Sequence, residues 1–240
     1  MRYGILGDIH GNIVALEAVL KALERDGYDR LASVGDIVGY NPWPLECVQI
    51  AVEKCQHIVV GNHDYGLIGL VDIDYFNPVA ADALAWTEAQ LPVEHFEFFE
   101  NLPLIVRTEH CGIVHATADR PKEFKYVFPN GNPEEAMAVQ DRKVFFYGHT
   151  HFPVAFFKGP APQIDDPSII PISEQCLTLI NVGSVGQPRD GNPLAAYALY
   201  DTDRRVVEIK RVKYDIKKTA DKIVEVGLPK MLADRLYTGQ

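Results

Sequence analysis

Cysteine is scarce in this chain, and its four cysteines do not form a recognisable ligand or disulfide motif. Cys47, Cys55, Cys111 and Cys176 contain no CxxC pair and no regular framework. This spacing excludes a zinc knuckle and a secreted scaffold built on disulfides. A chain of 240 residues buries enough apolar surface to be stable without cross-links. We therefore expect reduced thiols in a cytoplasmic protein.

Long apolar runs are absent, and basic residues are in the minority. No stretch is long and apolar enough to span a bilayer, and the N-terminus lacks the pattern of a signal peptide. The 23 lysines and arginines face 33 aspartates and glutamates, which gives a formal net charge of −10. Such a surface repels long polyanions and disfavours nucleic acid as a partner. We expect a small-molecule substrate and no membrane partner, and the composition leaves a homo-oligomer open.

Short apolar runs alternate with helical patterns over the first 60 residues. Strands are predicted at 3–7, 31–34 and 57–60. Helices are predicted between them, one from Asn12 to Gly27 and one over 45–55. The order strand, helix, strand, helix, strand predicts a parallel α/β sheet.

Residues 65–101 interrupt this alternation with a helical insert. Helices are predicted over about 78–90 and 92–101, each beginning at a proline. We expect most aromatic residues of the insert to pack it against the rest of the protein. The alternative is that one of them forms the wall of a substrate pocket, for which the candidates are Tyr65, Tyr75 and Phe76.

The second half of the chain is rich in predicted strands, at 104–108, 111–115, 143–147, 153–157, 176–181, 194–201 and 205–212. Residues 158–175 contain four prolines and are expected to form an exposed excursion. Two helices are predicted near 215–226 and 229–237. We expect one α/β domain over residues 1–240, with two packed sheets and outer helices. The insert and the loops 119–132 and 158–175 are expected to select the substrate.

Polar clusters follow five of the predicted strands: Asp8-Ile9-His10, Gly35-Asp36, Asn62-His63-Asp64, His115 and His149-Thr150-His151. In open α/β sheets, ligands bind beyond the carboxyl ends of the strands. The pairs Asp8/His10 and His149/His151 are spaced i, i+2, which in extended backbone puts both side chains on one face, where they can share a metal. Carboxylate, imidazole and amide donors suit Mn, Fe, Co or Zn.

Each cluster alone has a plainer interpretation. An isolated Asp-x-His is typical of a surface turn, and an isolated histidine after a strand is typical of a hydrogen-bonded interior residue. Asp36 and the Asn62–Asp64 segment alone are typical of turns or caps. These interpretations do not explain why all the clusters occur together, in order, at strand ends. The histidines outside the clusters are assigned structural or surface roles: His57, His95 and His110.

The clusters together resemble the calcineurin-like metallophosphoesterase superfamily. The residues that carry the resemblance are GDIHGN (7–12), GD (35–36), GNHD (61–64), His115 and GHTH (148–151). The segment NVGSVGQPRDG (181–191) is similar to a loop of the small bacterial and archaeal phosphodiesterase branch of that superfamily. The resemblance covers about residues 3–200 and implies a four-layer α/β/β/α sandwich with the site at the rim of both sheets.

The resemblance also implies two divalent metal ions, with Mn²⁺ favoured. The first ion would be held by Asp8, His10 and His151, and the second by Asn62, His115 and His149. Asp36 would bridge both ions, and His63 would face the substrate. The block GDIVGYNP (35–42) lacks the Asp-Arg of protein phosphatases, so the usual carboxylate partner of His63 is missing. Asp64, adjacent to His63 in the sequence, is the candidate for that place. Ala116 follows His115 where many relatives have glycine.

The implied reaction is hydrolysis of phosphodiesters or phosphomonoesters by a hydroxide that bridges the two metals. His63 is the candidate general acid. Asn12 and Arg189 are candidate substrate-binding residues, with helix capping and loop stabilisation as their alternative roles. Two other functions remain: a dinucleoside polyphosphate hydrolase, and a non-catalytic metal-binding scaffold of the same fold. A scaffold is expected to have lost ligands, whereas this sequence retains all seven and His63.

Overall fold

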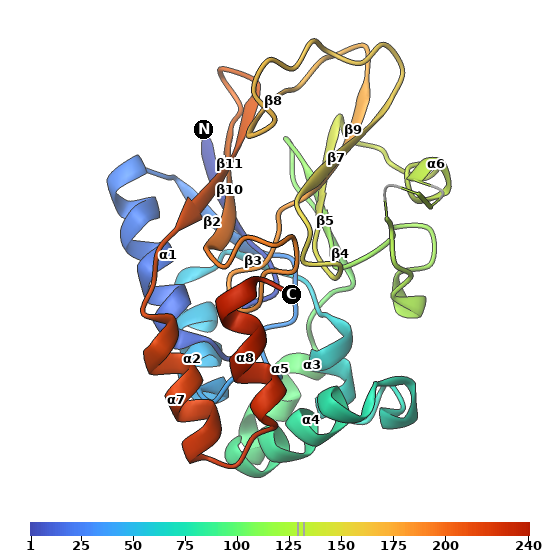
Figure 1. Cartoon of the computed structure of the whole chain (residues 1–240). Helices are drawn as coiled ribbons and strands as arrows, with labels where there is room; N and C mark the ends of the chain where they lie inside the picture. The colour runs from blue at the N-terminus through green and yellow to red at the C-terminus, as the bar shows by residue number, and fades with distance from the viewer. Residues whose placement is uncertain (129, 132) are drawn as a thin grey trace.

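Two β-sheets lie face to face in the computed structural model, which describes residues 1–128, 130–131 and 133–240 (Figure 1). The strands of the first sheet are, in spatial order, β3 (His57–Ile58), β2 (Arg30–Ser33), β1 (Arg2–Leu6), β10 (Ala195–Asp201), β11 (Val206–Val212) and β8 (Ile169–Pro171). Those of the second sheet are β4 (Ile105–Arg107), β5 (Gly112–Val114), β6 (Val144–Tyr147), β9 (Leu177–Asn181) and β7 (Val154–Lys158).

The predicted parallel core is confirmed in the first sheet, where β2 pairs in parallel with both β1 and β3. In the second sheet β6 pairs in parallel with both β5 and β9. Parallel neighbours end at the same edge of their sheet. The segments that follow these strands are therefore brought together at that edge.

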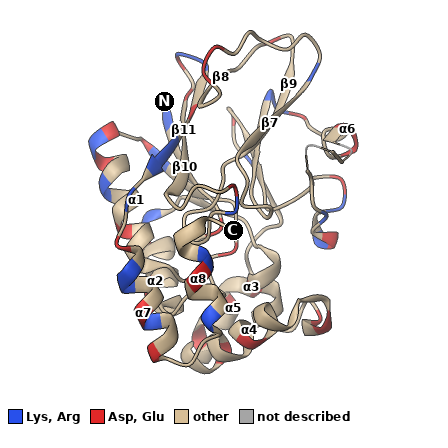
Figure 2. Ribbon diagram, in the orientation of Figure 1, with Lys and Arg blue, Asp and Glu red and all other residues tan. Residues whose placement is uncertain are grey.

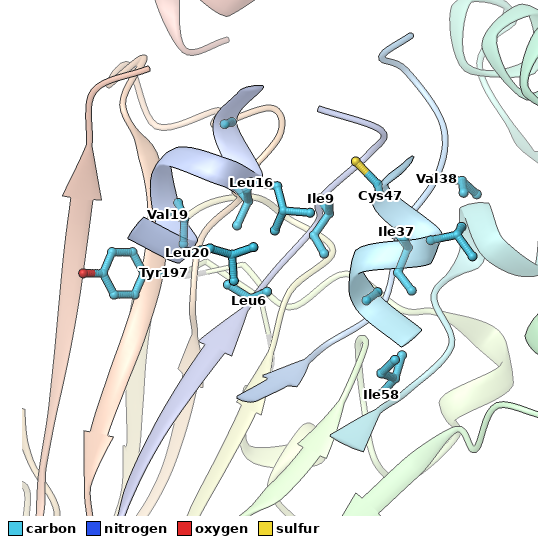
Figure 3. Packing of buried hydrophobic residues seen from close by; sticks show 14 of the residues in the cluster. Leu6, Ile9, Leu16, Val19, Leu20, Ile37, Val38, Cys47, Ile58 and Tyr197 are labelled. Carbon is cyan, nitrogen blue, oxygen red and sulfur yellow. The ribbon is translucent and has the colours of Figure 1, made fainter. Parts of the chain in front are cut away.

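Clusters of apolar side chains lie between the layers of the fold. Between the sheets, Ile5 and Val34 pack in one cluster with Phe146 and Ile180. Helices α1 (Ile13–Asp26) and α2 (Pro44–Lys54) cover the outer face of the first sheet. Figure 3 shows the residues that join these helices to β1 and to the loops after β1 and β2, among them Leu6, Ile9, Leu16, Val19, Ile37 and Cys47.

The fourth layer, over the second sheet, is thin. Phe145, Tyr147 and Leu179 pack there against Met137 and other apolar residues of the segment between β5 and β6. Its regular structure consists of η3 (Pro121–Glu123) and α6 (Pro133–Ala136). The expected α/β/β/α sandwich is confirmed, and its last layer is mostly irregular chain.

The helical insert begins earlier than the sequence predicts, because Asn62 already starts α3 (Asn62–Leu67). It continues through η1 (Ile73–Tyr75), α4 (Pro78–Gln90), η2 (Val93–His95) and α5 (Phe96–Glu100). The aromatics Phe76, Phe96, Phe98 and Phe99 pack against the cluster under α1 and α2, as expected. Trp86 packs against the closing helices α7 (Ile216–Glu225) and α8 (Lys230–Thr238).

One strand lies where the sequence predicts only an exposed excursion. β8, within 158–175, pairs antiparallel with β11, and its Ile170 is buried. Pro171 is compatible with this strand because an edge strand tolerates a missing N–H. The four prolines of this segment predict a loop, so the sequence pattern does not indicate this short strand.

Charged residues of both signs are interspersed on the outer helices α1, α7 and α8 and do not gather on one cationic face (Figure 2). All four cysteines are free. Among the described residues, no helix is both long enough and apolar enough to cross a bilayer.

Candidate metal centre

The seven predicted metal ligands converge at the edge where the parallel strands end. Asp8 and His10 follow β1, Asp36 follows β2, and Asn62 opens the helix after β3. From the second sheet come His115, after β5, and both His149 and His151, after β6. Six of these side chains are buried, and Asn62 is half-buried.

The donor atoms fall into two groups that share one residue. Asp8, His10, Asp36 and His151 form the first group, and Asp36, His115 and His149 form the second. Within each group the donor atoms lie within 4.8 Å of one another. Asn62 extends the second group, since its Oδ1 lies 3.1 Å from His115 Nε2.

The geometry of the facing His10 and His151 rings shows whether a cation fits between the donor atoms of the first group. His10 Nδ1 lies 2.8 Å from the carbonyl oxygen of Val38, and His151 Nδ1 lies 2.6 Å from that of Gln187. A carbonyl oxygen only accepts, so each Nδ1 is the protonated donor and each neutral ring has a lone pair on Nε2. These two Nε2 atoms are 3.1 Å apart. Two lone pairs repel at that distance unless a cation lies between them.

Burial keeps most of these imidazoles neutral, which is the form that binds metal. It lowers the pKa of His10 to about 4 and holds the pKa of His149 and of His151 well below the usual range. Burial acts the opposite way on Asp8 and raises its pKa to about 7. The site therefore destabilises an uncompensated carboxylate and offers neutral nitrogen donors beside it.

Asp36 and His115 form a buried pair whose pKa values shift in opposite directions. Burial raises the pKa of Asp36, but the charge of the neighbouring His115 outweighs it and leaves that pKa well below the usual range. Burial lowers the pKa of His115, but Asp36 outweighs it and raises that pKa to about 9. His115 Nε2 lies 3.4 Å from Asp36 Oδ2. The space between these atoms favours a positive charge, whether a proton or a metal ion.

The backbone at the ligands is left-handed, which corrects the expectation of extended i, i+2 pairs. The φ values are 47° at Asp8, 48° at His10, 52° at Asp36, 66° at His149 and 60° at His151. This conformation costs about 1–2 kcal/mol for a residue with a side chain, and such strain concentrates at functional sites. The i, i+2 argument also differs from the structure in a second respect, because His149 and His151 point into different groups.

Two glycines of the sequence clusters permit the close approach of these loops. A Cβ at Gly61 would collide with Asp36 Oδ1, and one at Gly148 would lie 2.5 Å from Asp8 Oδ2. Both contacts are closer than a side chain tolerates. The glycines of GNHD and GHTH therefore allow the carboxylates to reach the site.

Asp64 holds the loop that carries Asp36. Its Oδ2 accepts the backbone N–H groups of Gly61 and Asp36, and its Oδ1 accepts those of Ile37 and Val38. These bonds occupy both carboxylate oxygens, and no hydrogen bond to the His63 ring is among them. The geometry gives Asp64 a positioning role, whereas its sequence prediction was as the partner of His63.

His63 lies beside the metal groups and belongs to neither. Its backbone N–H donates to Asp36 Oδ1 at 2.9 Å, and its ring packs 4.7 Å from that of His10. Its Nδ1 is buried and has no hydrogen-bond partner among the residues that the structure describes. Burial lowers the pKa of His63 well below the usual range. A neutral ring with a free nitrogen thus lies next to the donor groups.

A cavity of about 1060 Å³ opens above His63, Asn62 and His149. One wall comes from the insert, and the other from residues 122–126 of the segment between β5 and β6. Five lining residues are aromatic: Tyr40, Tyr75, Phe76, Phe124 and Tyr126. Tyr75 and Phe76 were predicted candidates for this wall, whereas Tyr65 and the excursion 158–175 are not among the described lining residues. Of the loop 119–132, Pro129 and Asn132 lie outside the described residues.

The two predicted substrate-binding residues are placed differently. Asn12 is buried: its Oδ1 caps α1 by accepting from Ala15 N at 3.2 Å, and its Nδ2 donates to Gly186 O. Arg189 is half-buried, donates to Gln187 Oε1, and lies 5.4 Å from the centre of the Tyr40 ring. The contacts of Asn12 are those of a helix cap, and the Arg189 guanidinium lies one ring away from His10 and His63.

The sequence clusters did not reveal three features of this site. The carbonyl oxygens of Val34, Val38 and Gln187 orient the rings of His115, His10 and His151, and main-chain acceptors leave no residue-type signal. Tyr40, with φ of 61°, packs on both His10 and His63. Its position in GDIVGYNP was the only available clue. Tyr126 reaches the site from a segment in which no cluster was found.

Comparison with known proteins agrees with this geometry. The model of the calcineurin-like phosphoesterase superfamily domain matches residues 1–205. An uncharacterized protein of Methanocaldococcus jannaschii is 38% identical over 240 residues, covering 98% of this chain and 97% of its own. The phosphodiesterase YfcE of Escherichia coli K12 is 23% identical over 213 residues, covering 85% of this chain and 89% of its own.

A solved structure extends the agreement to the whole fold. The metallophosphoesterase from Sphaerobacter thermophilus superposes with a TM-score of 0.86 at 37% identity, covering 100% of this chain and 99% of its own. The family match, the fold and the buried carboxylate–imidazole groups identify one class of protein. The chain belongs to the calcineurin-like phosphoesterase superfamily and is a hydrolase of phosphoric esters.

Proposed function

We propose that this hydrolase uses two divalent metal ions to cleave small phosphodiesters or phosphomonoesters. The observation that carries the proposal is the sharing of Asp36 between two donor groups, together with the opposed Nε2 atoms of His10 and His151. Asp8, His10 and His151 would hold one ion, and Asn62, His115 and His149 the other, with Asp36 common to both. When bound, two such ions supply Lewis acidity and a water of lowered pKa.

The side chains of this protein would complete the reaction around the ions. His63 lines the cavity and has a free buried Nδ1. Because burial favours its neutral ring, we assign it a ring N–H that donates to the leaving oxygen or to a phosphoryl oxygen. Asp64 would act through the backbone of Asp36, not by taking a proton.

Arg189 is the candidate contact to a substrate anion outside the metal groups. Its guanidinium contacts a neutral amide oxygen and the Tyr40 ring, so its charge remains available to a ligand. For Asn12 we favour its observed place as the cap of α1, since its Oδ1 and Nδ2 both bond to the protein.

We favour Mn²⁺ as the ion, because mixed carboxylate, imidazole and amide donors suit a borderline to hard cation. The four free thiols favour a reducing compartment, which makes the cytoplasm the proposed location.

The test is hydrolysis of bis-p-nitrophenyl phosphate beside p-nitrophenyl phosphate by metal-stripped protein, with and without added Mn²⁺. Turnover that returns with the ion supports the metal-dependent hydrolase, and the ratio of the two rates ranks diester against monoester. A folded protein that binds Mn²⁺ but cleaves neither compound would favour the non-catalytic scaffold.

A dinucleoside polyphosphate hydrolase is the second candidate, and the aromatic lining of the cavity favours it. Planar bases stack on aromatic faces, and the insert wall of the cavity offers the exposed ring of Tyr75 beside Phe76. Activity on diadenosine tetraphosphate distinguishes the two candidate functions. Cleavage faster than that of bis-p-nitrophenyl phosphate would favour the second, and resistance to cleavage would remove it.

A further inference from the structure

One ligand histidine lacks the backbone hydrogen bond that orients the others. His10, His115 and His151 each place Nδ1 within 2.8 Å of a carbonyl oxygen and turn Nε2 toward the donor groups. His149 is reversed: its Nδ1 faces the second group, 3.2 Å from His115 Nε2, and its buried Nε2 has no hydrogen-bond partner in the part of the chain that the structure describes. A histidine that binds a metal through one ring nitrogen ordinarily donates a hydrogen bond from its other ring N–H, and this bond fixes the orientation of the ring. Something else must hold His149.

The ring of Tyr126 packs on the face of His149. It stacks on His149 with centroids 4.0 Å apart and planes inclined by 20°. Phe128 continues the stack on Tyr126 at 5.4 Å and 8°. Both aromatics come from the segment between β5 and β6, which forms one wall of the cavity. The face of His149 is therefore covered by the wall of the substrate cavity.

We propose that Tyr126 is the positioning residue of His149 and thereby sets the affinity of the second metal ion. Stacking at 4.0 Å restricts rotation of the imidazole about its Cβ–Cγ bond. It keeps Nδ1 directed at His115 and Asp36, and it covers a ring whose Nε2 has no hydrogen-bond partner among the described residues. The aromatic stack thus replaces the hydrogen bond that fixes the other three histidines. The inference rests on the proposed binding of two ions.

The same contact links substrate binding to the metal site. Tyr126 is 56% exposed although it stacks on a buried ligand. Much of its surface therefore remains open to the cavity that it lines. A substrate bound against Tyr126 would therefore contact the ring that fixes the orientation of His149.

A plainer alternative is that Tyr126 only packs its own loop. The two interpretations predict different metal binding. If Tyr126 only packs its loop, loss of its ring leaves the affinity for the second ion unchanged, whereas a positioning role predicts a lower affinity. Tyr126→Leu removes the stacking ring, and Tyr126→Phe preserves it. Tyr75→Leu is the matched control, because Tyr75 is an exposed aromatic of the opposite wall.

The experiment is titration of each metal-stripped variant with Mn²⁺, followed by calorimetry and by the electron paramagnetic resonance signal of a coupled manganese pair. We expect two ions and the coupled signal for wild type, Tyr126→Phe and Tyr75→Leu. For Tyr126→Leu we expect the second ion to bind at least about ten-fold more weakly and the first to be unchanged.

The outcomes separate the inference from the function on which it rests. Two ions bound by Tyr126→Leu with wild-type affinity would overturn the positioning role and leave the proposed function standing. A single ion bound by wild type would overturn both. Equal unfolding midpoints of the metal-free variants would show that a lost second ion does not reflect a misfolded protein, and a collapse confined to Tyr126→Leu would assign the residue to folding and reject the inference.

Discussion

The carboxylate of Asp64 accepts a 2.9 Å hydrogen bond from the backbone N–H of Asp36, the residue that both donor groups share. Asp36 in turn accepts the backbone N–H of His63 at 2.9 Å. The loops after β2 and β3 are thus joined reciprocally through two carboxylates. This exchange stabilises the left-handed backbone of Asp36, which has φ of 52°.

Asp64→Asn is expected to destabilise the protein more than it alters chemistry at His63. The amide has one acceptor oxygen for four N–H donors, so buried donors lose their partner at about 1–3 kcal/mol each. We expect the unfolding free energy of metal-free protein to fall by roughly 2–4 kcal/mol in urea. Asp72→Asn, in an exposed turn, is the control and should cost less than about 1 kcal/mol. Wild-type stability of Asp64→Asn would refute the positioning role.

His63→Gln is expected to retain metal and lose turnover. The ring belongs to neither donor group, yet it lines the cavity beside them. Loss of a positioned hydrogen-bond donor to the transition state reduces kcat by about a hundred-fold or more. Metal content per chain and kcat on bis-p-nitrophenyl phosphate measure the two effects separately, and His57→Gln, in β3, is the matched control. Unchanged kcat at full metal content would remove His63 from the mechanism.

Added Mn²⁺ should stabilise the metal-stripped protein, because the ion would neutralise the opposed lone pairs of His10 and His151. A free ion concentration of about 100 times Kd adds roughly 2.7 kcal/mol, which raises the unfolding midpoint by several degrees. Asp36→Asn should lose most of this rise, since both groups share that residue. Asp82→Asn, exposed on α4, should keep it. A full rise in Asp36→Asn would contradict the shared ligand.

A pH-dependent contribution to stability is expected from Asp26, far from the metal centre. Burial raises its pKa, but hydrogen bonds from Lys210 at 2.8 Å and Tyr197 at 2.6 Å outweigh this and lower it. A lowered folded-state pKa gives stability that is present above the unfolded pKa of about 3.9 and is lost as pH falls through the folded value.

Asp26→Asn should therefore cost about 1 kcal/mol near neutral pH and progressively less below about pH 4. Urea unfolding of metal-free wild type and variant across that range measures the difference, and Asp82→Asn controls for the change of net charge. A difference that stays constant down to about pH 2 would exclude the ionised carboxylate as its source.

The sequence by itself determined most of the elements and the residue types of the candidate site. Apolar periodicity between a capping asparagine and a terminal glycine located α1, and strand–helix alternation predicted the parallel core. The residue types in GDIHGN, GNHD and GHTH indicated a divalent metal site, because carboxylate and imidazole donors at strand ends have few other common purposes. These features are local, so short stretches of chain encode them.

The tertiary structure alone decided how those residues meet. Left-handed backbone at Asp8, His10, Asp36, His149 and His151 replaced the extended geometry that spacing predicts. Hydrogen bonds between segments far apart in the sequence stabilise it, such as those that the backbone of the Asp36 loop donates to Asp64. The same holds for β8, which forms only because β11 offers an edge, and for Tyr126, whose ring reaches His149 across the cavity wall. Pairings between distant segments leave no periodic signal in one chain, and only packing selects them.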